Sequence, residues 1–388
     1  MLGLILAWST VALAVSVLRG ARHDYVAYLR QWSLVAKGQD PWGEGSAYGP
    51  LHVALAYLAE LGPLIPKLFM VVAFLATNFL LAAALLKSRP RTSSLVAYLI
   101  FVPLNFLVIS IVISFGLNDA LAAALVGLAV LARFRGRLVV AGVLLGLAVL
   151  LKFYPALLLA FFCLDGRKFN SKLFLTTSCT TFVGFVLSLA IWGNGFIAPF
   201  VSGASRRPKL LSPLAAFRSH PELGGDSSIV DFLVDFNSIF VLIGCAVLLA
   251  VAYKMELTWI EGAALAGLTY PLIYKVGHPQ FYIPFMFLLV GLLILGTPRA
   301  RQLAYCFVPF VLFLSAFQFG YEVLTDGYRE IGGSVRRSVG FISFVLGIMT
   351  IAVSLATASR NTVGALKSGP AGRTHESDVE IATKSGIA

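Results

Sequence analysis

The stretch "AVLLKFYPALLL", residues 148–159, places a lysine and a proline inside an apolar run. Proline removes a backbone donor and interrupts a helix, so the stretch predicts two apolar helices that meet between Lys152 and Pro155. Similar apolar runs recur along nearly the whole chain. In lipid, a helix satisfies every backbone hydrogen bond internally. We therefore predict an all-α, polytopic membrane helix bundle.

The composition supports this class, because 59% of the residues are hydrophobic and only 12% are charged. The net charge of +12 is spread over short loops, which favours contact with anionic lipid and argues against nucleic acid as a partner. The four cysteines lie in apolar runs without ligand spacing. We predict no metal site and no cofactor.

We expect about 10–12 spans, because the apolar runs have helical length and are separated by polar turns. The first run has no basic segment before it and is long enough to span, so we expect an uncleaved helix and no signal peptide. The pieces at 119–133, 138–151 and 154–164 are short enough to be half-helices or a tilted pair. The predicted spans are 2–18, 65–86, 95–114, 119–133, 138–151, 154–164, 172–192, 236–253, 258–274, 279–296, 303–319 and 337–357.

The loops predict the orientation of the chain. Short basic loops such as "KSRPR" (87–91) and "RFRGR" (133–137) fall on one side, and short basic loops are typical of the cytoplasmic side. Arg19 and Arg22 favour the opposite orientation, but the other loops outweigh them. We expect a multi-pass protein of the cell inner (plasma) membrane, with its active site on the extracytoplasmic face.

The domain organisation follows from this orientation. A membrane domain covers 1–357, and its outer-face loops are 19–64, 193–235 and 320–336. Residues 358–388 are polar and lack apolar periodicity, so we expect a disordered cytoplasmic tail.

Asp24 follows the first span, in "RHDYVAYLRQWSLVAKGQDPW" (22–42). Tyr25, Tyr28 and Trp32 recur there at helical spacing, which predicts an amphipathic helix in the interface. Asp24 is either the N-cap of this helix or a base that takes a proton from a sugar hydroxyl.

Two further outer segments carry polar and aromatic side chains. The segment at 39–55, "QDPWGEGSAYGPLHVAL", holds Trp42 and Tyr48, which either bind a sugar ring or anchor the loop in the interface. The turn "SFGLND" (114–119) opens a helix with Asn118 and Asp119. Either residue could be the N-cap of that helix, and both would face the same compartment as Asp24.

Cations gather on the same predicted face. Lys152 either reaches the interface from a helix end or receives a lipid phosphate. Lys275 and His278 lie in "YKVGHPQFYIPF" (274–285), beside a proline break. Arg206 and Arg207 suit an anionic headgroup or plain contact with anionic lipid.

The order of these motifs resembles the GT-C integral-membrane glycosyltransferases that use polyprenyl-phosphate sugars. It looks closest to the bacterial polyprenyl-phosphate-mannose-dependent mannosyltransferases and to the catalytic subunit of GPI mannosyltransferase I. Those proteins carry an acidic "D-Y" motif after the first span, a "G-N" turn, a "K-x-Y-P" and a late "H/Q-x-Y/F-x-x-P". The matching segments are "HDYVAYLRQWSLVAKGQDPWGEGSAYGPL", "FGLNDALAAALVGLAVLARFRGR", "LKFYP" and "HPQFYIPF".

The resemblance implies a fold, a reaction and a site. Asp24 would be the general base of an inverting transfer, most often of mannose, from a polyprenyl-phosphate donor to a lipid or glycan acceptor. The expected partners are this donor, the acceptor and membrane lipids, with no obligate protein partner. The expected site residues are Lys152, Tyr154, Lys275, His278, Arg206 and Arg207 for the donor phosphate, and Tyr25, Asp40, Trp42, Tyr48, Asn118, Asp119 and Gln280 for the sugar or acceptor.

The sequence departs from the family pattern at three positions. Arg22 stands where some relatives carry a second acid, Trp42 stands where tyrosine is usual, and Gly49 precedes Pro50 where a polar residue is common. These differences leave the donor sugar, the acceptor and a role for metal open.

Other functions fit part of the pattern. A transporter or flippase for a lipid-linked or anionic solute would also have many spans and interrupted helices, but the sequence shows no internal repeat. An O-antigen polymerase or ligase would have a basic outer loop such as 193–235, and a non-catalytic scaffold is the remaining alternative.

Overall fold

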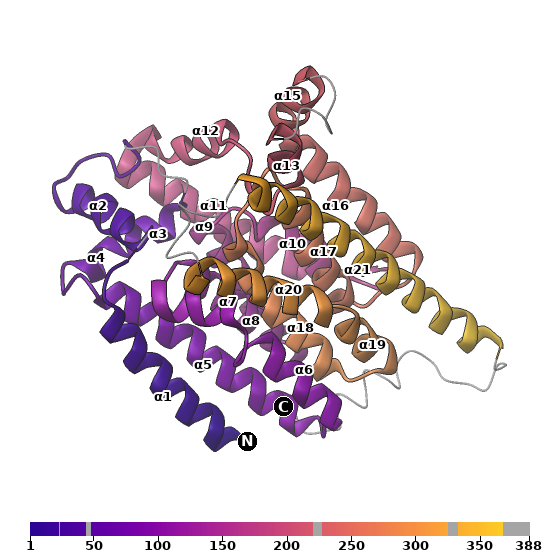
Figure 1. Ribbon diagram of the computed structural model, residues 1–388. Helices are drawn as coiled ribbons and strands as arrows, with labels where there is room; N and C mark the ends of the chain where they lie inside the picture. Colours follow the sequence, from indigo (N-terminus) through magenta and orange to yellow (C-terminus); the bar gives the residue numbers. More distant parts are fainter. Residues whose placement is uncertain (23, 44–47, 220–226, 325–332, 368–388) are drawn as a thin grey trace.

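The computed structural model describes residues 1–22, 24–43, 48–219, 227–324 and 333–367 (Figure 1). The predicted all-α polytopic bundle is confirmed, because helices form nearly all the regular structure. The strands of the described residues are two-residue pairs, β1 with β2 in an antiparallel hairpin and β3 with β4 in parallel.

The chain order begins at α1 and ends at α21. The elements are α1 (Leu2–Arg19), α2 (Asp24–Ala36), α3 (Pro50–Ala54), α4 (Ala56–Ala59), α5 (Ile65–Lys87), α6 (Thr92–Phe101), α7 (Phe106–Val108), the π-helix η1 (Ile109–Phe115), α8 (Asp119–Phe134), α9 (Leu138–Leu151), α10 (Ala156–Cys163), β1 (Leu164–Asp165), β2 (Lys168–Phe169), α11 (Ser171–Trp192), η2 (Gly193–Ile197), α12 (Ala198–Ser205), β3 (Lys209–Leu210), α13 (Pro213–Ser219), α15 (Ser227–Asp235), α16 (Asn237–Lys254), α17 (Trp259–Ile273), β4 (Val276–Gly277), η3 (Pro279–Tyr282), α18 (Ile283–Leu295), α19 (Pro298–Cys306), α20 (Val308–Phe319), the π-helix η4 (Gly320–Leu324) and α21 (Gly333–Lys367).

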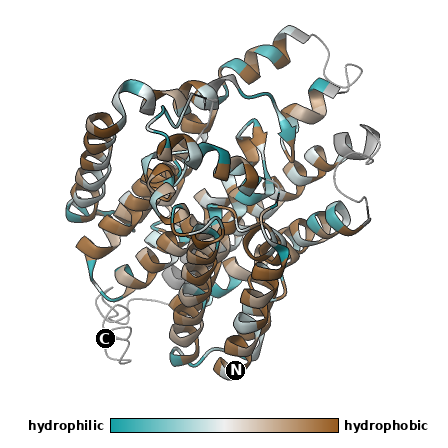
Figure 2. Cartoon of the chain, turned by 90° about the vertical axis from the view of Figure 1, so that its left-hand side faces the viewer, coloured by the Kyte–Doolittle hydropathy of each residue, from teal (hydrophilic) through white to brown (hydrophobic). Residues whose placement is uncertain are grey.

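Within the described residues, 7 helical segments are long and apolar enough to cross a membrane. They are Leu2–Arg19, Ile65–Lys87, Thr92–Phe115, Ser171–Gly195, Asn237–Lys254, Pro298–Val323 and Ser338–Ser359. The other predicted spans correspond to the shorter helices α8, α9, α10, α17 and α18. In Figure 2 the helices are mostly apolar, and polar residues gather at their ends.

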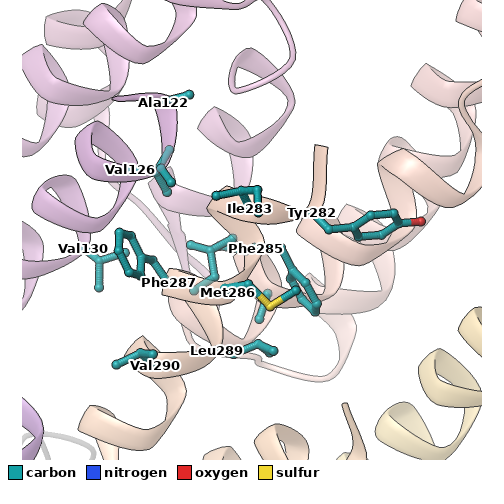
Figure 3. Packing of buried hydrophobic residues seen from close by; sticks show 14 of the residues in the cluster. Ala122, Val126, Val130, Tyr282, Ile283, Phe285, Met286, Phe287, Leu289 and Val290 are labelled. Carbon is teal, nitrogen blue, oxygen red and sulfur yellow. The ribbon is translucent and has the colours of Figure 1, made fainter. Parts of the chain in front are cut away.

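The short helices form the centre of the bundle, where α18 packs against α8, α17 and α5. Figure 3 shows Phe287 of α18 beside Val126 and Val130 of α8. Phe287 also stacks on Phe74 of α5, with ring centroids 4.7 Å apart. Gly127 permits this approach, because a Cβ there would lie 2.7 Å from Phe287 Cδ2. Tight packing of this kind holds helices together in lipid, where apolar transfer contributes little.

Small residues also join α9 to α11. A Cβ on Gly142 would meet Thr176, and one on Gly146 would meet Thr180, both closer than 3 Å. This arrangement is the small-residue contact that lets membrane helices approach closely. It holds α9 close against α11.

One end of the bundle is closed by charge pairs. Glu261 accepts hydrogen bonds from Arg299 Nε at 2.8 Å and Nη2 at 2.7 Å. Arg133 lies 3.9 Å from Asp165 and packs over the ring of Trp259, 4.6 Å from its centroid. These pairs tie α8, α17 and α19 to the hairpin of β1 and β2, at the end of the bundle that holds the short basic loops.

The other end carries α2, α3, α12, α13 and α15 (Figure 1). Gly49 seats α3 on the end of α9, because its N–H donates to Leu151 O at 3.1 Å. A Cβ on Gly49 would collide with the carbonyl of Leu150. Gly49, which departs from the family pattern, is thus required by this backbone contact.

Two predicted boundaries meet the limits of the described residues. The predicted outer loop 320–336 is helical at Gly320–Leu324 and again from Gly333, and 325–332 lie outside the described residues. The predicted tail begins at Ala358, but α21 continues to Lys367, and 368–388 lie outside the described residues.

We predict that Phe287→Ala destabilises the bundle by about 2 kcal/mol, because it opens a cavity between α18, α8 and α5. The melting temperature of the protein in detergent tests this. The matched control is Phe182→Ala, since Phe182 lies on α11 with 69% of its surface exposed. Equal melting temperatures of the two variants would contradict the central position of α18.

Candidate active site

One acidic and one basic side chain meet where the start of α8 lies beside the end of α9. The helices are joined by a short turn and run side by side, so the start of α8 and the end of α9 lie together. Asp119 opens α8, and Lys152 follows α9 in extended backbone. Lys152 Nζ donates to Asp119 Oδ2 at 2.6 Å, and the two residues are 4% and 0% exposed. A buried ion pair of this kind fixes the register of the two helices.

Aromatic rings surround this pair. Lys152 Nζ lies 5.3 Å from the ring centroid of Tyr48 and 5.8 Å from that of Phe281, where the ring quadrupoles stabilise the cation. Tyr154 donates to Asp119 Oδ1 at 3.4 Å and stacks on Tyr270 at 5.1 Å. The proline break thus directs Lys152 and Tyr154 to the same carboxylate.

Asn118 belongs to a second buried network beside the pair. Tyr28 donates to Asn118 Oδ1 at 3.0 Å, and Asn118 Nδ2 donates to His52 Nδ1 at 3.2 Å. Burial, and then the positive charge of Lys152, lowers the pKa of His52 to about 3. The ring is therefore neutral, and its Nδ1 accepts the amide hydrogen.

Helix α2 places Asp24 at the rim of this network. Tyr25, Tyr28 and Trp32 are buried on the face of α2 that contacts the protein, whereas Asp24 in the first turn is exposed. The predicted amphipathic helix is confirmed, and its aromatic face packs on the protein. The carboxylate of Asp24 interacts electrostatically with Lys152 and with the hydroxyl of Tyr48.

The pairing of β3 with β4 adds cations to the same end. Lys209 N donates to Lys275 O at 3.2 Å, and Leu211 N donates to Gly277 O at 3.0 Å. Arg206, just before β3, thereby interacts electrostatically with Lys152 and His278. Burial lowers the pKa of His278 to about 3, and the nearby cations add to this effect. His278 is a neutral hydrogen-bonding group at physiological pH.

Other predicted site residues lie elsewhere. Lys275 is buried, and its ammonium donates to Val234 O at 3.1 Å, in the last turn of α15. Trp42 is 2% exposed and packs edge-on against Trp192, with centroids 5.9 Å apart. Asp40 Oδ1 accepts from Trp42 N at 2.9 Å and lies against Gly195.

The remaining predicted residues divide by exposure. Arg207 is exposed beside Arg206, and Gln280 is buried in η3. Tyr25 is buried, and its hydroxyl donates to Pro63 O at 2.7 Å. The structure therefore brings together Asp24, Tyr48, Asn118, Asp119, Lys152, Tyr154, Arg206 and His278.

The sequence did not predict the contacts of His52, of Tyr28 as a hydrogen-bond donor, or of Lys67 at the start of α5. His52 gave no signal beyond an isolated polar residue near Pro50. Lys67 stands in an apolar run, which is the feature that pointed to Lys152. Within the described ranges, no group of His, Cys, Asp or Glu side chains has the geometry of a metal site.

The sequence profile of glycosyltransferase family 87 matches residues 47–219. This segment contains the Asp119–Lys152 pair, Asn118 and Arg206, whereas Asp24 and His278 lie outside it. The match supports a membrane glycosyltransferase, and the long apolar helices agree with a multi-pass membrane protein. No curated protein matches the chain.

We predict that Asp119→Asn and Lys152→Met each destabilise the protein by about 3 kcal/mol, because each leaves one buried charge without its partner. The double variant should regain part of this loss. Thermal unfolding in detergent measures it. The control pair Arg218→Met and Asp231→Asn, whose side chains are 47% and 57% exposed, should change stability by at most about 0.5 kcal/mol. Additive losses at 119 and 152 would contradict the pairing.

Proposed function

We propose that this membrane glycosyltransferase moves a sugar from a polyprenyl-phosphate donor to a lipid or glycan acceptor on the outer face of the cell inner membrane. Mannose is the proposed sugar, because the motifs look closest to those of mannosyltransferases that use polyprenyl-phosphate mannose. The acceptor hydroxyl attacks the anomeric carbon, the carbon–phosphate oxygen bond breaks, and polyprenyl phosphate leaves. The configuration at the anomeric carbon is inverted.

The exposure of the two acids supports Asp24 as the general base. Asp119 is fully buried and its carboxylate is engaged by Lys152 and Tyr154. Asp24 is exposed at the rim of the same network, so an acceptor hydroxyl can approach it. In the proposed step, the proton of that hydroxyl passes to the carboxylate of Asp24 as the new glycosidic bond forms.

The cations support a lipid-phosphate leaving group. The departing phosphate gains negative charge as the glycosidic bond breaks, and cations fixed nearby stabilise that charge. Arg206 is half-buried next to β3 and lies within electrostatic reach of Lys152. We assign Arg206 the direct phosphate contact. Lys152 adds a positive field that Asp119 partly neutralises, and neutral His278 can donate a hydrogen bond.

Tyr48 supports sugar binding between the acid and the cations. It is partly exposed and lies over Lys152, and an aromatic ring suits the face of a sugar. Asn118 is buried between Tyr28 and His52 and supports the network behind Tyr48. Asp40, Trp42 and Gln280 support the surrounding loops, because each is engaged in packing or buried.

A single observation carries the proposal. An exposed carboxylate, a buried Asp–Lys pair and Arg206 meet at one end of the bundle, although Asp24, Asp119, Lys152 and Arg206 are far apart in the sequence. The short basic loops at the opposite end support an extracytoplasmic location for this site.

We predict that Asp24→Asn reduces sugar transfer at least ~100-fold, because the acceptor hydroxyl loses its base. Purified protein in liposomes would receive polyprenyl-phosphate-[14C]mannose and extracted membrane lipids, and label in the acceptor would be counted. The control Asp231→Asn, which changes an exposed side chain of α15, should transfer at the wild-type rate. Unchanged transfer by Asp24→Asn would exclude Asp24 as the base, and label that crosses the membrane on an unchanged donor would favour a transporter.

Replacing Arg206 should weaken donor binding. We predict that Arg206→Ala raises the KM for the donor roughly 10-fold, because a charge-assisted contact to phosphate is lost. Initial rates against donor concentration test this, with Arg218→Ala as the matched control on the same side. A donor KM that is unchanged in Arg206→Ala would place the phosphate elsewhere.

A further inference from the structure

Lys67 is a buried lysine that the proposed chemistry does not use. It lies in the first turns of α5 and is 0% exposed. Its ammonium donates to Ser16 O at 3.0 Å, Gly20 O at 2.7 Å and Ser114 O at 2.9 Å. An ammonium has three hydrogens, so each has a backbone carbonyl acceptor.

These carbonyls belong to two segments that end just before site residues. Ser16 and Gly20 lie at the end of α1, which leads directly into Asp24. Ser114 lies at the end of the π-helix η1, which leads into Asn118 and Asp119. The last carbonyls of a helix have no partner within it, and a lysine at that end also suits the helix dipole.

A second contact links Lys67 to α2. The backbone N–H of Lys67 donates to the hydroxyl of Tyr25 at 3.1 Å, and that hydroxyl donates to Pro63 O at 2.7 Å. Tyr25 is the neighbour of Asp24 in the first turn of α2. The start of α5 therefore holds α2 from both sides, through the end of α1 and through Tyr25.

Gly116 shows that the lysine stem is fitted into the turn before Asn118. Gly116 has a φ of 65°, and a Cβ there would lie 2.7 Å from Lys67 Cε. The turn and the side chain occupy one space, so a movement of Lys67 must move the turn.

We propose that Lys67 is a positioning residue that holds Asp24 at a fixed place relative to the Asp119–Lys152 pair. The inference rests on the proposed function. Lys67 touches no substrate in this account. It acts through Asp24, by joining the ends of α1 and η1 and by supporting Tyr25. A misplaced base lowers the rate of the chemical step more than it lowers the affinity for the donor.

The test measures kcat and donor KM for Lys67→Met, Lys67→Arg and the control Lys87→Met, which removes an exposed lysine from the other end of α5. Lys67→Met should lower kcat about 10- to 100-fold with less than about a twofold change in donor KM. Lys67→Arg retains a cation with hydrogen-bond donors, so its decrease in log kcat should be smaller than that of Lys67→Met by at least about a third. A folded Lys67→Met with wild-type kcat, or with kcat and donor affinity falling together, would overturn the proposal.

A double variant distinguishes positioning from general support. In the Asp24→Asn background, Lys67→Met should lower the residual rate less than about twofold, because the group through which Lys67 acts is already absent. A full multiplicative loss would overturn the proposal. Tyr25→Phe, a milder change, should lower kcat about 3- to 10-fold with donor KM unchanged. Wild-type kcat in Tyr25→Phe would exclude a contribution of the contact between Lys67 and α2 through the Tyr25 hydroxyl. If Asp24→Asn itself keeps the wild-type rate, the proposed function fails at its base, independently of Lys67.

Discussion

The 2.6 Å contact between Lys152 and Asp119 constrains the arrangement of the end of the bundle that carries α2, α3 and α12. Both residues are buried, and a charge without its partner in such a place is costly. The start of α8 and the end of α9 must therefore lie at the same height along the bundle. The loop before α3 is hydrogen-bonded to the end of α9. Asn118, beside the pair, is hydrogen-bonded to Tyr28 and His52.

The two ends of the bundle use charge differently. At the end with the short basic loops, Glu261 and Arg299 satisfy each other in a bidentate pair, and Arg133 is covered by Trp259. At the other end, a buried pair is joined by an exposed acid and a half-buried arginine. Charges that satisfy each other stabilise a fold, whereas accessible charges of both signs around aromatic rings can bind and transform a polar substrate.

The helix positions were predictable from the sequence, because each apolar run must form a helix in lipid. The alternation of basic loops also placed Asp24, Asn118 and Lys152 at one end, where the structure has them. The contacts of their side chains were not predictable. Lys152 appeared as a free cation for phosphate, and its partner Asp119 became evident only once α8 and α9 were packed together. Its replacement is therefore expected to lower the stability of the protein.

The same limit applies to residues that turn away from the site. Lys275 was expected beside the phosphate, but it lies next to the parallel pair of β3 and β4, and its ammonium donates to Val234 O in the last turn of α15. Trp42 packs on Trp192, the last residue of α11. Such contacts join segments distant in sequence, and their direction depends on tertiary packing that periodicity does not encode.

The nature of the donor tests the account most directly. Purified protein in liposomes would be given mannose either on polyprenyl phosphate or on a nucleoside diphosphate, and labelled acceptor and free polyprenyl phosphate would be measured together. We predict transfer only from the lipid-linked donor, with one polyprenyl phosphate released for each sugar transferred. Transfer from the nucleotide sugar alone, or sugar transfer without release of polyprenyl phosphate, would contradict it.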